Sequence, residues 1–259
     1  MGDYSRHGYI WVPSRRDLLK TAGVLAAGLV APRIARAATF GVVAHMAQGL
    51  LANGGDTSSN KINTTGASLL VLALSWYSGS PTITDRTDSG PTGNTWTLLA
   101  SDITSMPLSL YYVINPVVGP GHYVTVVQTS GYPGVGFMAF SGADLTAPYD
   151  GQHSQHGDGL SWPGSITPAE NNALVIGAVA NQTTTARVIT NGSMTMLDST
   201  LNVTGASVGI STAYVIQTTA TAINPTWTSL YANGDILASF KPAAGGGTRR
   251  RVVVTTGGE

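Results

Sequence analysis

The amino-acid sequence predicts an all-β fold, a two-sheet antiparallel β-sandwich that is built from an internal duplication. Two observations lead to this prediction. The first is an unbroken apolar run at residues 67–76, which is too short to span a bilayer and has the composition of a strand covered on both faces. The second is the return of a run of the same character at residues 172–180.

Each apolar run is followed by three further strand-like segments in the same order. The segments are residues 95–99, 109–114 and 136–140 after the first run, and residues 193–197, 211–216 and 235–240 after the second. The spacings agree, since Thr97 precedes Thr195 by 98 residues and Phe140 precedes Phe240 by 100. A single four-stranded sheet would leave one apolar face bare, so we expect the half-repeats, residues 66–142 and 172–241, to pack face to face in a jelly-roll-like sandwich within one domain, residues 38–242.

The remaining strands of the first half are predicted from local patterns. Residues 40–46 are expected to form an edge strand, and residues 108–114 alternate between an apolar and a mixed face. Residues 122–128 are rich in β-branched side chains, and turn-rich segments separate these runs. Residues 141–171 are interpreted as the linker between the halves.

Charge and cysteine content exclude some classes of function. The chain has 13 basic and 13 acidic residues, but six basic and two acidic residues lie in the first 37 positions, which leaves seven basic and eleven acidic residues in the remainder. A net charge of −4 offers no basic face to a nucleic-acid backbone. With no cysteine, the chain has no disulfide, thiol nucleophile or thiolate metal site.

The N-terminus resembles a twin-arginine (Tat) export signal. Ser14-Arg15-Arg16-Asp17-Leu18-Leu19-Lys20 matches the pattern Ser-Arg-Arg-x-Phe-Leu-Lys, with leucine in place of the usual phenylalanine. A mildly apolar segment at residues 21–30, a basic stretch and an Ala-x-Ala pattern ending at residue 37 follow. The resemblance implies a signal helix within residues 1–37, recognition of Arg15 and Arg16 by the Tat machinery, and export to the periplasm, the cell surface or the medium.

The most polar loop of the body, residues 85–94, is the first candidate site. Asp85, Asp88 and Asn94 supply the oxygen ligands that calcium takes, although their spacing is not that of an EF-hand. Trp96 and Tyr111 stand close in sequence and are candidates to cover the apolar face of a sugar, with Asp85, Asp88 and Asn94 fixing its hydroxyls. The alternatives are an Asx-type hairpin loop without a metal, which the composition favours, and aromatic rings that belong to the core.

The linker between the halves holds a weaker candidate metal site. His153 and His156 lie with Asp150 and Asp158 within nine residues, which is enough ligands for zinc if the segment curls. A glycine-rich segment lacks the frame that holds metal ligands, so we favour a solvated linker.

The body resembles the duplicated jelly-roll or concanavalin-like modules of bacterial surface proteins and phage tail or fibre proteins. The resemblance rests on the Leu-Leu-Val-Leu-Ala strand at residues 69–73, the hairpin that ends Gly-Asn-Thr-Trp-Thr at residues 93–97, and the Phe-Ser-Gly strand end at residues 140–142. These motifs are structural and imply no catalytic residue and no cofactor other than the candidate calcium.

We therefore expect an exported, non-catalytic module that binds carbohydrate or another cell-surface component. One alternative is a structural surface or virion component that self-assembles as a homo-oligomer, with the basic tail at residues 243–259 as its attachment element. The other is an enzyme that acts on polysaccharide, which would need a carboxylate pair based on aspartate, because Glu170 is the only glutamate in the body.

Overall fold

The described part of the chain is all-β, as the sequence predicts. The computed structural model describes residues 39–50, 55–103, 106–128, 131–156, 163–185, 187–191, 193–203, 208–228 and 233–244. These ranges contain no helix, and so none that could span a lipid bilayer. The predicted signal helix, with Arg15 and Arg16, lies outside the described residues, as does the tail from residue 245 onward.

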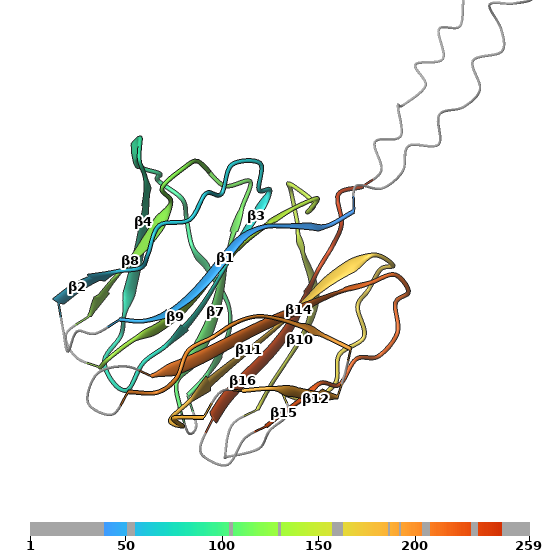
Figure 1. Ribbon diagram of the computed structural model, residues 1–259. Helices are drawn as coiled ribbons and strands as arrows, with labels where there is room; N and C mark the ends of the chain where they lie inside the picture. Colours follow the sequence, from blue (N-terminus) through green and yellow to red (C-terminus); the bar gives the residue numbers. More distant parts are fainter. Residues whose placement is uncertain are drawn as a thin grey trace, which may run out of the picture. The chain divides into compact units, whose positions relative to one another are not determined.

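The described residues form sixteen strands, which Figure 1 colours from blue to red along the chain. Their bounds are β1 (Gly41–Gly49), β2 (Gly55–Ser58), β3 (Leu69–Ser75), β4 (Thr82–Thr87), β5 (Gly90–Pro91), β6 (Thr97–Asp102), β7 (Leu108–Ile114), β8 (Tyr123–Gln128), β9 (Gly134–Ser141), β10 (Tyr149–His156), β11 (Ala173–Asn181), β12 (Ile189–Asn191), β13 (Thr195–Ser199), β14 (Gly209–Gln217), β15 (Thr226–Trp227) and β16 (Asn233–Phe240).

Two five-stranded antiparallel sheets form the centre of the fold (Figure 1). Sheet one has the order β1-β9-β3-β7-β6, and sheet two has the order β10-β16-β11-β14-β13. A four-stranded sheet, β2-β8-β4-β5, and a two-stranded sheet, β12-β15, complete the structure. Every paired strand runs antiparallel to its neighbour.

The central strand of sheet one, β3, is buried along its whole length. Its side chains alternate between two cores. Leu69, Val71 and Ala73 belong to the core that is shared with sheet two. Leu70, Leu72 and Leu74 belong to the core that is shared with the four-stranded sheet. The prediction of a strand covered on both faces is therefore confirmed, and each fully buried leucine contributes about 1.5–3 kcal/mol to the stability of the fold.

The central strand of sheet two, β11, is buried in the same way. Leu174 and Ile176 face the core between the two sheets, whereas Val175 and Val179 pack in a third core with Trp227 of β15. The structure is thus a layered, β-sandwich-like arrangement in which two thin outer sheets cover the outer faces of the central pair.

Sheets one and two have the same topology. Numbered by order along the chain, the five strands of each sheet lie in the order first, fifth, second, fourth, third. The register also agrees, because Leu69 opposes Phe140 and Leu174 opposes Phe240. A register irregularity follows Leu98 in β6 and Met196 in β13.

The contacts between the two sheets are reciprocal. Strand β1 of sheet one contacts β13 of sheet two, and β6 of sheet one contacts β10 of sheet two. His45 Nδ1 lies 2.5 Å from Asp198 Oδ2 across the β1–β13 edge. The strand starts at Gly134 and Gly234 pass so close to the opposite sheet that any Cβ there would clash with a backbone carbonyl.

The predicted linker is only partly a linker, because residues 149–156 form the edge strand β10. This segment has little intrinsic β-propensity, and its strand conformation comes from pairing with β16. Gly151 takes a φ of 85° where the register shifts, which a side chain would disfavour. Each sheet therefore gains a first strand, β1 or β10, that precedes the predicted half-repeat.

Candidate functional site

The first groove lies where β6 begins and β7 ends, at the edge of sheet one. It has a volume of about 340 Å³, within the size range of small-molecule sites. Its lining comprises Gly93, Asn94, Thr95, Thr97, Val113, Ile114, Asn115 and Val117. The pairing of β6 with β7 brings the two stretches together, so the groove is a product of the sheet.

The chemical character of the first groove is polar but uncharged. Thr95, Thr97 and Asn115 are exposed, and their side chains make no hydrogen bond with any other described residue. Ile114 and Val117 are 37% and 54% exposed and add an aliphatic surface beside them. Hydroxyl and amide groups next to aliphatic surface suit a neutral ligand with many hydroxyl groups.

The amide of Asn94 fixes one wall of the groove. Its Nδ2 donates to Asp85 Oδ2 at 2.7 Å and to the carbonyl of Val117 at 3.0 Å, while its Oδ1 accepts from the Val117 N–H at 2.8 Å. Both amide protons are therefore used within the protein. Asn94 positions the groove and has one remaining lone pair for a ligand.

Asp85 is the centre of a buried hydrogen-bond network behind this wall. Its carboxylate accepts from the Thr92 hydroxyl, from Asn94 and from His122, each at 2.7 Å. Burial raises the pKa of Asp85, but hydrogen bonds from His122, Asn94 and Thr92 outweigh burial and hold the pKa below its ordinary value. Thr64 Oγ1 lies 2.8 Å from His122 Nδ1 and extends the network to the backbone of Gly119.

The hydrogen-bonded series Asp85–His122–Thr64 has the residue types of a catalytic triad. The burial of these three side chains argues against a catalytic role. Thr64 and His122 are 0% exposed, and Asp85 is 5% exposed. His122 Nε2–H donates to Asp85, and Thr64 Oγ1 lies within hydrogen-bond distance of both His122 Nδ1 and the Gly119 carbonyl, so each of these side chains has a polar partner. No substrate can reach the Thr64 hydroxyl in this conformation, and the network acts as a support for the groove.

The other predicted calcium ligand, Asp88, points to a different partner. Its Oδ1 accepts a hydrogen bond from the exposed Lys61 ammonium at 2.7 Å, and its backbone N–H donates to Pro120. The structure therefore brings Asp85 and Asn94 together but gives Asp88 separate contacts. Among the described residues no group of three or more His, Asp or Glu side chains could hold a metal ion.

The two predicted sugar-covering rings pack toward the core beneath the four-stranded sheet. Trp96 is partly buried and meets Phe137 edge-on, with ring centroids 6.1 Å apart. Tyr111 is also partly buried, and burial raises the pKa of its phenol. Neither ring lines the first groove.

The predicted histidine pair lies on β10. The ring of His153 is exposed, and its Nδ1 lies 2.6 Å from the Tyr149 hydroxyl. The side chain of His156 lies outside the described residues, as does Asp158. Asp150 accepts hydrogen bonds from the backbone N–H groups of Gln152 and Ala169, which ties this segment to the loop before β11.

A buried carboxylate cluster has no counterpart in the sequence predictions. Asp235 of β16 is 0% exposed, and Asp102 of β6 is 4% exposed. Burial, with the added effect of Asp102, raises the pKa of Asp235 to about 8, against the opposing effect of Arg187. Neither carboxylate can contact a substrate in this conformation, and sequence patterns could not find the pair because 133 residues separate its members.

The residues of the first groove were also missed by sequence reasoning, apart from Asn94. Thr95, Thr97 and Asn115 resemble the many other polar residues of a threonine-rich chain. The one sequence pattern that marks this groove is Asn115-Pro116, a dipeptide typical of turns, directly after a predicted strand. In the structure Asn115 takes a φ of 46°. Comparisons of the chain with family models, with curated proteins and with solved structures found no match.

Proposed function

We propose that this chain is an exported, non-catalytic module that binds neutral carbohydrate, with the first groove as its binding site. The observation that carries the proposal is the uncharged lining of this groove, in which exposed hydroxyl and amide groups flank exposed aliphatic surface. Sugars present the matching combination of hydroxyl groups and apolar C–H faces.

The buried network behind the groove supports this proposal. A weakly binding polar site gains affinity when its groups are held in place before the ligand arrives. Asp85 and His122 hold Asn94, and Asn94 holds the backbone at Val117, so the wall of the groove is preorganised. The predicted roles change accordingly, because Asp85 acts as a positioning residue and the ligand contacts fall to Thr95, Thr97 and Asn115.

We also propose that the fold arose by internal duplication and that the chain is exported. The shared strand order, register and bulge position of sheets one and two support an internal duplication. The resemblance of residues 14–20 to a twin-arginine signal supports export, and a cell-surface glycan is then an accessible partner.

A glycan array probed with the full-length chain tests the function. We expect binding to neutral glycans, and a binding loss of about 30-fold in the double variant Thr97→Ala/Asn115→Gly, because two hydrogen bonds of about 1 kcal/mol each are removed. Glycine at position 115 keeps the positive φ accessible. Thr84→Ala, an exposed threonine of β4 outside the groove, is the matched control.

The array separates this function from its alternatives. A blank array, or binding that the double variant leaves unchanged, would overturn the proposal and favour a structural surface component. Repeating the array with a calcium chelator tests the prediction that Asp85 and Asp88 bind calcium. Loss of binding with the chelator would support that prediction, because the proposed ligand contacts of the first groove involve no metal.

A further inference from the structure

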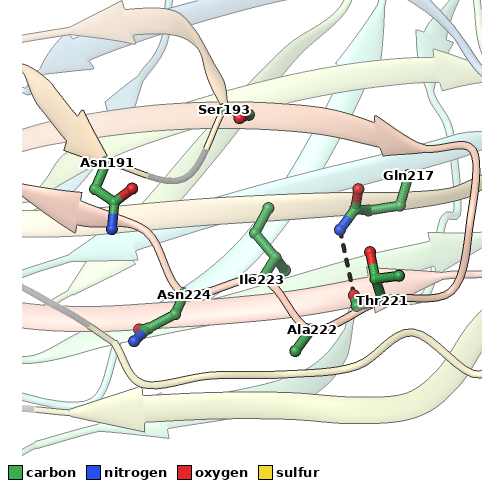
Figure 2. Close-up of a pocket in the computed structure, with 7 residues that line it drawn as sticks. All are labelled: Asn191, Ser193, Gln217, Thr221, Ala222, Ile223 and Asn224. Carbon is green, nitrogen blue, oxygen red and sulfur yellow. Dashed lines mark hydrogen bonds between the residues drawn. The ribbon is translucent and has the colours of Figure 1, made fainter.

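A second groove lies at the edge of sheet two, where β13 begins and β14 ends (Figure 2). It has a volume of about 360 Å³, close to that of the first groove. Figure 2 shows the amide side chains of Asn191, Gln217 and Asn224 arranged around Ile223, with Ser193 above them. None of the described residues that line the two grooves carries a charged side chain.

The register of the sheets places the two grooves at equivalent positions. In sheet one Thr97 of β6 opposes Tyr112 of β7, and in sheet two Thr195 of β13 opposes Tyr214 of β14. Both pairs form the outer end of a strand pair that has the same bulge further along. The residues that line the two grooves can therefore be compared by counting from these two pairs.

Counting outward from these pairs identifies equivalent lining residues. Thr95 and Asn115 lie two residues before and three residues after the reference pair of sheet one. Ser193 and Gln217 lie at the same positions in sheet two. Each groove thus has a hydroxyl just before the third strand of its sheet and an amide just beyond or at the end of the fourth.

The surroundings of the two grooves differ, because Ile223 lines the second groove whereas His122 does not line the first. An isolated bridge pairs Ile62 with His122 in the first half, and a corresponding bridge pairs Ile166 with Ile223 in the second. The second half therefore replaces the buried histidine with an isoleucine that is 6% exposed. The second groove has an aliphatic floor where the first has a buried polar network behind its wall.

The amide rim of the second groove is available to a ligand. Gln217 Nε2 donates to the carbonyl of Thr221 at 3.3 Å, which orients this amide and leaves its oxygen as an acceptor (Figure 2). Asn191 and Asn224 are exposed, and their side chains make no hydrogen bond with other described residues. Ser193 holds a φ of 54°, a conformation that costs a non-glycine residue free energy and that often marks a functional site.

We propose that the second groove is a second binding site, which takes the same class of neutral, polyhydroxylated ligand as the first, so that each chain carries two sites. This inference rests on the proposed function. The described residues that line the two grooves include no aromatic ring, so we expect each site alone to bind weakly. Two weak sites on one chain give firm attachment to a polysaccharide or to a glycan-coated surface, where many copies of the ligand are present.

Side-chain amide NMR of the full-length chain tests the second site directly. The probes are the methyl glycosides of glucose, mannose and galactose, each titrated into ¹⁵N-labelled protein. We expect the amide signals of Asn115 in the first groove and of Asn191, Gln217 and Asn224 in the second to shift with saturable curves. The amide of Asn181, which is buried, serves as an internal control that does not shift.

Variants separate the two sites. Thr97→Ala should weaken the response of Asn115 and leave that of Gln217 unchanged, whereas Asn224→Ala should weaken the response of Gln217 about fivefold and leave that of Asn115 unchanged. Shifts at Asn115 alone would overturn the second site and leave the proposed function in place. Shifts at Gln217 and Asn224 alone would support the second site and overturn the first, and no shift with any of the three glycosides would overturn both.

Discussion

Asp235 lies buried in β16 beside Asp102 and Arg187, and this environment displaces its proton equilibrium. Burial, followed in effect by the charge of Asp102, raises the pKa of Asp235 from 3.8 to about 8. Between these two pH values the folded protein retains a proton that the unfolded chain has released. The contribution of Asp235 to the free energy of unfolding therefore decreases as pH rises from about 4 to about 8, and it levels off above that pH.

The variant Asp235→Asn removes this dependence, because the amide has nearly the same shape and does not ionise. We expect the variant to match the wild type near pH 4, and to be more stable than the wild type by about 5 kcal/mol at pH 8, because each unit of the rise in the pKa corresponds to about 1.4 kcal/mol. Urea unfolding at pH 4, 6 and 8 measures the difference. Asp56→Asn, at an exposed position of β2, is the control, and an equal pH dependence in wild type and Asp235→Asn would contradict the prediction.

Single residues also show where sequence reasoning reaches its limit. The sequence identified Asp85 and Asn94 as chemically important, and the structure joins them in one network. The third member, His122, could not be found, because 37 residues separate it from Asp85 and its neighbours in sequence are those of an ordinary strand. The sequence also could not show that Trp96 packs toward a core, since the alternation of apolar and polar residues does not say which face of a sheet is covered by a further layer.

At the scale of elements, the starts of β9 and β16 lie close to the opposite central sheet. A Cβ at Gly134 would clash with the carbonyl oxygen of Val208, and a Cβ at Gly234 would clash with that of Met106. The two contacts are reciprocal, because each glycine is the first or second residue of the fifth strand of its own sheet and meets a residue just before the fourth strand of the other sheet.

The substitutions Gly134→Ala and Gly234→Ala should each destabilise the protein by about 1–3 kcal/mol, because the sheets must separate locally to admit the methyl group. Chemical denaturation of the single variants measures both effects. Gly119→Ala is the control, since a Cβ there meets Thr87 only at an ordinary contact distance of 3.5 Å. A loss at one glycine without a loss at the other would show that the contacts are not equivalent.

The strands themselves were predictable to different degrees. The buried strands β3 and β11 and the alternating strand β7 follow from apolar content and period, and the structure confirms them. Strand β10 was not predictable, because its Gly-Gln-His-Ser-Gln sequence has no β-propensity and forms a strand only through β16. The two grooves could not be predicted for the same reason, since each forms only when two strands pair.

At the scale of the molecule, one core holds the two halves together. The cluster between the central sheets takes eleven buried apolar residues from the first half and nine from the second. Each half also has a core beneath its own outer sheet. A half on its own would expose the inner face of a five-stranded sheet, which is far more apolar surface than a soluble monomer tolerates.

We therefore expect residues 39–144 and 145–244, when produced separately, to aggregate or to lack a cooperative unfolding transition. Co-expressed halves should associate and recover the unfolding transition of the intact chain. Size-exclusion chromatography and urea unfolding followed by circular dichroism check both outcomes. A soluble, monomeric half with its own sharp transition would show that the shared core is dispensable.

The position of the fifth strand within each sheet determines when the fold can form. Strand β9 pairs with both β1 and β3, and β16 pairs with both β10 and β11. During synthesis the first strand of each half therefore has no partner in its sheet, and the second strand, which pairs with β7 or β14 on one side, keeps its other edge open until the last strand of that half leaves the ribosome. Apolar strands with open edges are prone to association in that interval. We expect prematurely terminated products to aggregate, and production of the intact chain to depend on chaperones that shield β3 until β9 has emerged and β11 until β16 has emerged.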